Sequence, residues 1–266
     1  MDSATIPKVI RRLGLTASVM RLKRLLVMAG LWPRDGFHHR HRKNAYSQLS
    51  GRGLEIGALH FPASLSANCT VEYCDANSRE ESEKIFPELD STLLVEVDHI
   101  VNLDEDILST KVRAPYDFVI MNHVIEHVAN PVSVIEGLFS IVKTGGLIVV
   151  AAPDKEFTFD KPRQLTPLDH LLDEYKNGVS SVDDEHYLDF IRHVAPEIFN
   201  SGNKELLASI LSSVRDRREH AHVWNSETFI EFLKGSMEFL GLNAKFEYIS
   251  EARTNHAECF VLLRKL

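Results

Sequence analysis

The chain has 266 residues, of which 44% are hydrophobic and 26% are charged, values that are ordinary for a globular protein. This composition excludes a fibrous or wholly disordered chain, and the length fits one large or two small domains. Three cysteines cannot staple a fold of this size, so we interpret them as buried thiols in a cytoplasmic, reducing compartment. A cysteine-based zinc site is not expected.

The net charge of -8 hides a strong asymmetry along the chain. The first 43 residues contain ten Lys and Arg residues but only two acidic residues, so the remaining chain is strongly acidic. Binding to nucleic acid needs clustered cations that neutralise phosphates. We therefore expect no nucleic-acid partner for the acidic body, and treat the basic segment separately.

Residues 1–46 form a predicted basic, helical N-terminal arm. Apolar residues recur at helical spacing over residues 6–13, and a second helical pattern covers residues 17–31. The longest apolar run, Leu25 to Trp32, is too short to span a bilayer, which takes about 20 residues. We expect the arm to pack on the body. A peripheral contact with anionic lipid, or a contact with an acidic partner or substrate, are the alternatives.

From Gly51 onward, short apolar runs alternate with helical or loop segments, which is typical of an α/β sheet. A helix with Asn130 as its N-cap is predicted from Pro131, and another begins at Asn225 or Ser226. The predicted strands are Gly53–Ile56, Thr70–Cys74, His99–Leu103, Tyr116–Met121, Gly146–Ala152, Lys245–Ile249 and Glu258–Leu263. The pattern predicts a doubly wound, Rossmann-like sheet that closes with a C-terminal antiparallel hairpin.

An insertion divides this predicted core. We assign residues 47–153 and 223–266 to the core and residues 154–222 to a helical cap, because the connection is far longer than usual. Helical spacing occurs over residues 168–175, 181–194 and 207–214, and Thr166 resembles the start of a capping box. The cap should lie beside the carboxyl ends of the strands, where ligands bind in such sheets.

The first two strands indicate the kind of ligand. Asp75 ends the second strand, 18 residues after Gly57, where a carboxylate can accept hydrogen bonds from both ribose hydroxyls of an adenosine group. The turn from Gly57 to Pro62 lacks the further glycines that let a backbone approach a pyrophosphate. An adenosine ligand without phosphate, such as S-adenosylmethionine, fits better.

At this point the motifs resemble those of class I S-adenosylmethionine-dependent methyltransferases of the type 11-like group. The resemblance covers residues 51–153 and, more loosely, 223–266. Leu54-Glu55-Ile56-Gly57 is similar to the first motif of the family, and Asp75 to its ribose-binding acid. The other similar segments are Asp104–Leu108, Tyr116–Ile120, Asn122–Val128 and Lys143–Leu147.

The resemblance implies transfer of a methyl group from S-adenosylmethionine to a nucleophile. It implies these cofactor-binding residues: Glu55, Gly57, Ala58, Asp75, Asp104, Glu105 and Asn122. The chain departs from the family in its glycine turn, where only Gly57 is present, and the first helix is predicted to be short or absent. Alignment of the reacting groups supplies most of the catalysis in such a transfer, and a base assists a hydroxyl acceptor.

The run His123-Val124-Ile125-Glu126-His127 matches H-x-x-E-H, which elsewhere marks the helix of a zinc peptidase. We expect the helix here to begin only after His123, at the end of the fourth strand. Glu126 and His127 are therefore interpreted as structural, and His123 as the catalytic base or a substrate contact. No metal ligand is assigned, and a metal-dependent hydrolase remains an alternative.

The cap suggests the acceptor. Asp160 and Arg163 lie in a polar loop and are predicted to bind the substrate, and His170 is a second candidate catalytic residue. Together they favour a small-molecule or glycan-type acceptor with a hydroxyl group. The alternative from another class is a non-catalytic module with a methyltransferase fold, which would not bind S-adenosylhomocysteine. The oligomeric state is not predicted.

Overall fold

The computed structural model describes residues 40–266, which contain a seven-stranded sheet in the order β3-β2-β1-β4-β5-β7-β6. Strands β1 to β5 are parallel, and β7 runs antiparallel to both β5 and β6. The strands are β1 (Gly51–Ile56), β2 (Cys69–Asp75), β3 (His99–Ile100), β4 (Tyr116–Asn122), β5 (Val142–Pro153), β6 (Ala244–Ser250) and β7 (Glu258–Lys265). The predicted Rossmann-like sheet with a C-terminal antiparallel hairpin is confirmed.

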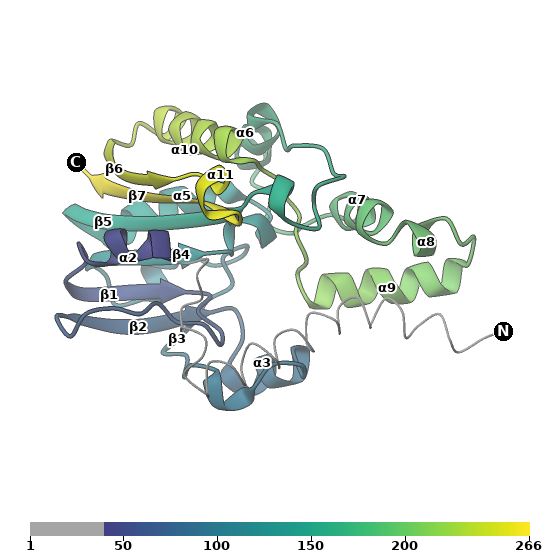
Figure 1. The fold of residues 1–266 in the computed structure, drawn as a ribbon, viewed down its shortest axis with the longest axis horizontal. Helices are drawn as coiled ribbons and strands as arrows, with labels where there is room; N and C mark the ends of the chain where they lie inside the picture. The colour runs from purple at the N-terminus through teal and green to yellow at the C-terminus, as the bar shows by residue number, and fades with distance from the viewer. Residues whose placement is uncertain (1–39) are drawn as a thin grey trace.

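Successive residues of a strand point to opposite faces of the sheet. The central strand β4 is apolar at consecutive positions, so both faces of the sheet are apolar there. Val119 and Met121 of β4 pack on one side with α5 (Pro131–Ile141), α6 (Leu168–Lys176) and α10 (Ser226–Leu240). Phe118 and Ile120 face the other side, where α2 (Arg40–Tyr46) contributes Ala45 and Tyr46 (Figure 1). The main core therefore lies between the sheet and the three helices.

Helices α5 and α10 begin where the sequence predicts. The Asn130 side chain accepts a hydrogen bond from the Ser133 amide at 3.0 Å, and Pro131 opens α5. Asn225 caps α10 in the same way by accepting from Thr228 at 2.8 Å. A cap of this kind satisfies an amide that the helix itself cannot.

The connection from β1 to β2 contains no helix, as predicted. Residues 57–68 form an irregular loop, which is held because the Ala63 amide donates to both carboxylate oxygens of Glu55 at 2.9 and 3.1 Å. Strand β3 is shorter than predicted and ends at Ile100. The chain turns here because the Asn102 amide donates a hydrogen bond to the Asp106 carboxylate at 2.9 Å instead of to a neighbouring strand.

The insertion forms a helical cap. Helices α7 (Asp184–Val194), α8 (Pro196–Phe199) and α9 (Lys204–Asp216) share a small apolar core, and lie beyond the ends toward which the parallel strands point (Figure 1). The predicted capping box at Thr166 is wrong. Helix α6 begins after Pro167 without a side-chain cap, and the Thr166 hydroxyl instead accepts from the Val223 amide at 3.0 Å. Thr166 thus joins the beginning of the cap to its end.

The remaining helical elements are short. They are α3 (Arg79–Ile85), α4 (Leu108–Lys111) and α11 (Ala252–Asn255), with 3-10 turns at Ser91–Leu93, Ile125–His127 and Lys155–Phe157. The predicted helices of residues 6–13 and 17–31, and the lipid contact proposed for them, lie outside the described residues. Within residues 40–266, no helix has both the length and the apolar character needed to cross a membrane.

Candidate functional site

The turn after β1 leaves no room for a side chain at Gly57. Its φ is +72°, a left-handed conformation that favours glycine, and an added Cβ would lie 2.3 Å from Val124 Cγ2. The Gly57 amide donates to the carbonyl of Cys74 at 2.9 Å. The backbone ends of β1, β2 and β4 therefore approach closely at this edge of the sheet.

Polar groups face this edge without protein partners among the described residues. Asn122 is the last residue of β4, and His60 follows the glycine turn. Their Oδ1 and Nδ1 atoms are buried and have no hydrogen bond to any part of residues 40–266. Asp75 is half-buried at the end of β2, and its carboxylate accepts the Asn77 amide at 3.2 Å. Burial raises the pKa of Asp75. Buried polar atoms without partners are the groups that a bound ligand satisfies.

The other predicted cofactor residues have mixed environments. Glu55 is buried, and its carboxylate holds the β1–β2 loop through Ala63; burial raises its pKa to about 7. Ala58 is buried and Glu105 is exposed. Asp104 accepts the Ala129 amide at 2.7 Å, which ties it to the loop before α5, and burial raises its pKa. The structure thus gives the carboxylates of Glu55, Asp75 and Asp104 hydrogen bonds from backbone amides, and the Asp75 carboxylate bonds only within its own turn.

His123 follows β4 with a φ of +55°. Its Nε2 lies 2.6 Å from Glu258 Oε2, and its side chain is 39% exposed. A carboxylate only accepts hydrogen bonds, so Nε2 carries the proton of the neutral ring and Nδ1 is left as an acceptor. This Nδ1 lies 3.7 Å from Glu126 Oε1, beyond hydrogen-bond distance. Glu258 therefore orients the imidazole that the sequence singles out.

Glu258 is fully buried and is held from two further directions. Arg42 Nε donates to its Oε1 at 2.7 Å, Arg42 also reaches Oε2, and His41 Nε2 lies 2.6 Å from Oε1. Burial alone would raise the pKa of Glu258, but the hydrogen bonds from His123, His41 and Arg42 outweigh it and keep this pKa well below its usual range. The carboxylate is therefore ionised, and α2 belongs to the site as well as to the core.

Within the remaining part of the H-x-x-E-H run, Glu126 is buried and His127 is partly exposed. Glu126 has two carboxylate oxygens without hydrogen bonds among the described residues, and burial raises its pKa. His127 Nε2 lies 3.7 Å and His220 Nε2 lies 3.9 Å from Glu126 Oε1. Since His123 precedes the 3-10 turn Ile125–His127, its ring and that of His127 are not carried by one helix as in a zinc peptidase.

Asp160 and Arg163 lie inside the cap. Both are almost fully buried, and Arg163 Nη1 donates to Asp160 Oδ1 at 2.9 Å and to the carbonyl of His220 at 2.9 Å. His220 Nδ1 lies 2.6 Å from Asp160 Oδ2. Burial alone would raise the pKa of Asp160, but His220 and Arg163 outweigh it and lower that pKa. The predicted contact of these two side chains with a substrate is at odds with their burial, because they bind each other and the cap backbone instead.

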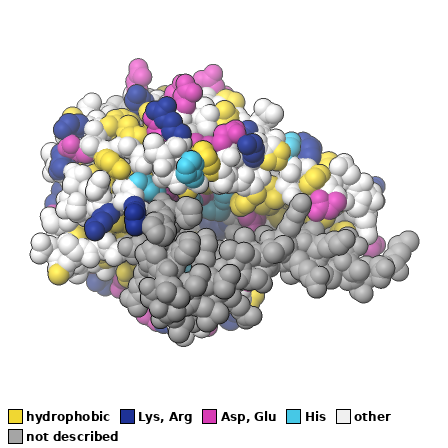
Figure 2. All heavy atoms as spheres, in the orientation of Figure 1, with side chains coloured by type: hydrophobic (Ala, Val, Ile, Leu, Met, Phe, Trp, Pro, Cys, Tyr) yellow, Lys and Arg dark blue, Asp and Glu magenta, His cyan; other side chains and the backbone are white. Residues whose placement is uncertain are grey.

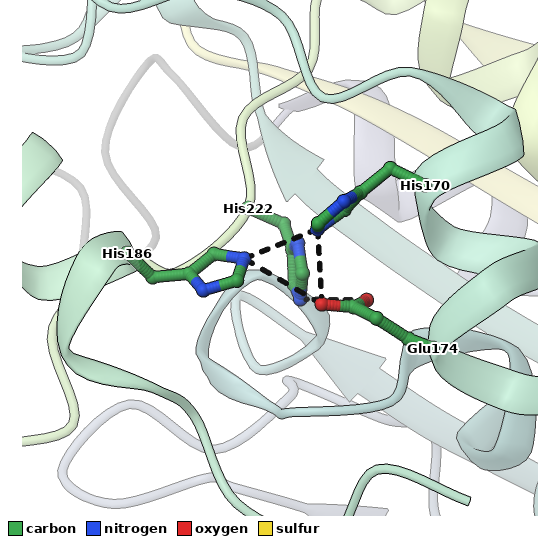
Figure 3. Close-up of side chains that lie close together, drawn as sticks. All are labelled: His170, Glu174, His186 and His222. Atoms are coloured by element: carbon green, nitrogen blue, oxygen red, sulfur yellow. Dashed lines mark hydrogen bonds and ion pairs between the residues drawn. The ribbon is translucent and has the colours of Figure 1, made fainter. Parts of the chain in front are cut away.

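His170 is brought together with three residues that the sequence analysis does not single out. It lies on α6, and its Nε2 is 3.0 Å from Glu174 Oε1 and 3.2 Å from His186 Nε2. His222, from the segment before α10, completes the group (Figure 3). Histidine side chains also reach the surface near the middle of the face shown in Figure 2.

Sequence reasoning misses Glu258, although the sequence contains a signal for it. Glu258 precedes the apolar run Cys259–Leu263, and a charged residue at the start of a buried strand needs a partner. Because β7 is antiparallel to β5, its first residue lies at the same edge as the carboxyl ends of the parallel strands. Knowing the strand direction would have placed Glu258 beside His123.

Comparison with known proteins gives the family. The sequence model of a methyltransferase domain family matches residues 38–236, which is well over half of the chain. The chain belongs to this methyltransferase family. Its cofactor is therefore S-adenosyl-L-methionine. No curated protein matches the chain.

Solved structures with a similar fold have low sequence identity to this methyltransferase. The N-methyltransferase NodS from Bradyrhizobium japonicum, in complex with S-adenosyl-L-homocysteine, is 12% identical, with a TM-score of 0.42 over 86% of this chain and 85% of that chain. The N-terminal domain of EvdMO1 with S-adenosylhomocysteine bound is 13% identical, with a TM-score of 0.42 over 89% and 83%. An O-methyltransferase family protein from Burkholderia thailandensis is 12% identical, with a TM-score of 0.43 over 85% and 56%.

Proposed function

We propose that this methyltransferase transfers the methyl group to a hydroxyl of a small-molecule or glycan-type acceptor, with His123 as the general base. The single observation that carries the proposal is the contact of 2.6 Å between His123 Nε2 and the buried Glu258 carboxylate. A histidine oriented by a carboxylate is the arrangement that keeps one ring nitrogen ready to accept a proton.

The adenosine end of the cofactor would be held by groups at the carboxyl ends of β1, β2 and β4. We assign the ribose to Asp75, and further polar contacts to the buried Asn122 Oδ1 and His60 Nδ1, which have no partner within residues 40–266. At Gly57 the turn can pack closely against Val124, because glycine has no Cβ to collide with it. When bound, S-adenosylmethionine supplies an electrophilic methyl group on a positively charged sulfur.

The residues of the chain then have to align the acceptor hydroxyl and accept its proton. An acceptor hydroxyl beside His123 would give its proton to Nδ1 as its oxygen forms the bond to the methyl carbon, and the bond from that carbon to sulfur would break with its electron pair staying on sulfur. The ionised Glu258 stabilises the imidazolium that results, through Nε2. Alignment supplies most of the rate enhancement in such a transfer, and the base contributes about 10²–10⁴-fold.

The test uses the full chain with methyl-labelled S-adenosylmethionine and two panels of acceptors. One panel contains nucleotide sugars, oligosaccharides and phenols, and the other contains amines of matched size. We expect label on oxygen in the first panel. Label found only on nitrogen or carbon would overturn the hydroxyl acceptor, and a chain that does not bind S-adenosylhomocysteine in calorimetry would favour the non-catalytic alternative.

The role of His123 is tested with the acceptor that this screen identifies. We expect His123→Ala to lower kcat by about 10²–10⁴-fold while the Kd for S-adenosylhomocysteine changes little. The control is His193→Ala, which removes a half-buried histidine of α7 that contacts Asp189 instead. An equal loss of kcat in both variants, or no loss in His123→Ala, would contradict the assignment.

A further inference from the structure

Four potential metal ligands converge inside the cap. His170 and Glu174 come from α6, His186 comes from α7, and His222 comes from the segment that leads into α10 (Figure 3). Each side chain offers one ligand atom, and these atoms all lie within 4.8 Å of one another. Residues from three separate segments therefore direct nitrogen and oxygen atoms at one point.

Four of the distances between these side chains are close to those between the ligands of a tetrahedrally coordinated ion, with Glu174 Oε1 facing His170 and His186 and Glu174 Oε2 facing His222. Bonds of 2.0–2.2 Å from zinc to nitrogen or oxygen give a tetrahedron whose edges are about 3.3–3.6 Å. Glu174 Oε1 lies 3.0 Å from His170 Nε2 and 3.5 Å from His186 Nε2. Glu174 Oε2 lies 3.6 Å from His222 Nε2, and the Nε2 atoms of His170 and His186 are 3.2 Å apart.

Several of these atoms are buried without partners. Glu174 Oε2 and both ring nitrogens of His222 have no hydrogen bond among the described residues, and His222 is only 1% exposed. A buried polar atom without a partner destabilises the fold, and a bound cation would provide the missing partner. A cavity of about 110 Å³ lies between the four side chains and Ala129, Val179 and Ser181. It gives an ion room to enter.

An outer contact also orients one of the ligands. His186 Nδ1 lies 2.9 Å from Asp183 Oδ1, so the carboxylate accepts a hydrogen bond from Nδ1–H, and Nε2 is the nitrogen left to bind a metal. Metal-binding histidines have this contact almost always, because it fixes both the tautomer and the orientation of the ring.

We propose that His170, Glu174, His186 and His222 bind a Zn²⁺ ion that ties the cap together. Three imidazoles and a single carboxylate suit zinc better than Mg²⁺ or Ca²⁺, which prefer oxygen ligands. Four protein ligands complete a tetrahedral shell, which is typical of structural zinc, whereas catalytic zinc keeps a position open. The ion joins α6, which packs on the core, to α7 of the cap and to the start of α10.

A second group, Glu126, His127 and His220, is less suited to the same ion. It brings three ligands together, and its histidine nitrogens lie 3.7 and 3.9 Å from the Glu126 carboxylate oxygen. The cap cluster has the fourth ligand, the closer spacing and the cavity. The Glu126 group is therefore the competing location that the experiment has to separate.

The experiment measures zinc binding without an acceptor or a cofactor. The full chain is stripped with a chelator and titrated with Zn²⁺ by calorimetry, and its metal content is measured by mass spectrometry. We expect one Zn²⁺ per chain and a rise in Tm on binding. His170 is 44% exposed, so His170→Ala should fold, and we expect it to weaken zinc binding at least about 100-fold, the upper range for losing even an outer-shell partner.

Four variants decide the result, and Co²⁺ provides a second readout because a tetrahedral site gives it strong visible absorption. His186→Asn should abolish that absorption, whereas His193→Ala on the same helix should leave it unchanged. The proposal fails if the stripped chain binds no zinc, or if His170→Ala binds it as tightly as the unchanged chain does. It also fails if His220→Ala loses the ion and His170→Ala keeps it, since the metal would then belong to the Glu126 group.

Discussion

Asp75 is the residue on which recognition of the cofactor depends most directly. Its half-buried carboxylate accepts a hydrogen bond from its own turn and has no assigned role in holding the sheet together. We expect Asp75→Ala to weaken binding of S-adenosylhomocysteine by about 1.5–3 kcal/mol, the range for hydrogen bonds to a charged group. Calorimetry measures this loss directly, and Asp216→Ala at the exposed end of α9 is the matched control. Equal affinities for the Asp75 variant and the unchanged chain would contradict the assignment of the ribose to Asp75.

Glu55 makes a prediction about pH. Burial raises its pKa from 4.5 to about 7, so between these values the folded chain holds a proton that the unfolded chain has released. The free energy of unfolding therefore falls as pH rises through this window. Glu55→Gln keeps an oxygen for the Ala63 amide but does not ionise, so its stability relative to the unchanged chain should rise by about 2–3 kcal/mol from pH 5 to pH 8. Urea unfolding at both pH values measures this, and a constant difference would show that Glu55 keeps an ordinary pKa.

At the scale of elements, Gly57 joins the end of β1 to the turn after β4. Gly57→Ala would combine a left-handed φ of +72° with a Cβ placed 2.3 Å from Val124 Cγ2. The conformation alone costs about 1–2 kcal/mol, and the clash adds to it. Gly145→Ala is a matched control, because Gly145 has a φ of +79° and nothing within 4 Å of an added Cβ. We expect Gly57→Ala to lower stability further than the control and to weaken S-adenosylhomocysteine binding. Equal losses would show that the contact with Val124 relaxes.

The strands were predictable because their signal is local. The continuous apolar runs of β4 and β7 identify strands without knowledge of their partners. The pairing of His123 with Glu258 was not, because 135 positions separate them and only the direction of β7 brings them together. The same holds for His170 on α6, His186 on α7 and His222 in the segment before α10, because nothing in their local sequence patterns indicates a common point. The length of β3 was overestimated because a side chain, Asp106, ends it.

At the scale of the whole molecule, the cap has an apolar core separate from those of the sheet, and a buried polar network ties its segments together. Arg163 is at the centre of this network, where it contacts Asp160, Asp189 and the carbonyls of His220 and Ala221. Arg163→Met would leave Asp160 without its guanidinium partner, and removing one side of a buried ion pair costs about 3–5 kcal/mol. We expect hydrogen exchange to accelerate in α7 to α9 more than in β1, β4 and β5.

The matched control for this change is Arg215→Met. Arg215 also pairs with an aspartate, Asp184 at 2.6 Å, but the pair is exposed, and such pairs contribute about 0–1 kcal/mol. Its exchange pattern should match that of the unchanged chain. Uniform acceleration across the sheet and the cap in Arg163→Met would mean that the two parts unfold as one unit.

The two ends of the insertion lie side by side. Asp154 and Trp224 form a β-bridge, and the Lys155 amide donates to the carbonyl of Trp224 at 2.9 Å. Because the chain leaves and re-enters the sheet at neighbouring positions, a segment of very different length or shape could be exchanged here without altering the strand order. A replaced insertion would thus leave the pairing of β5 with β4 and β7 unchanged, because both of its ends are anchored at a single point beside the sheet.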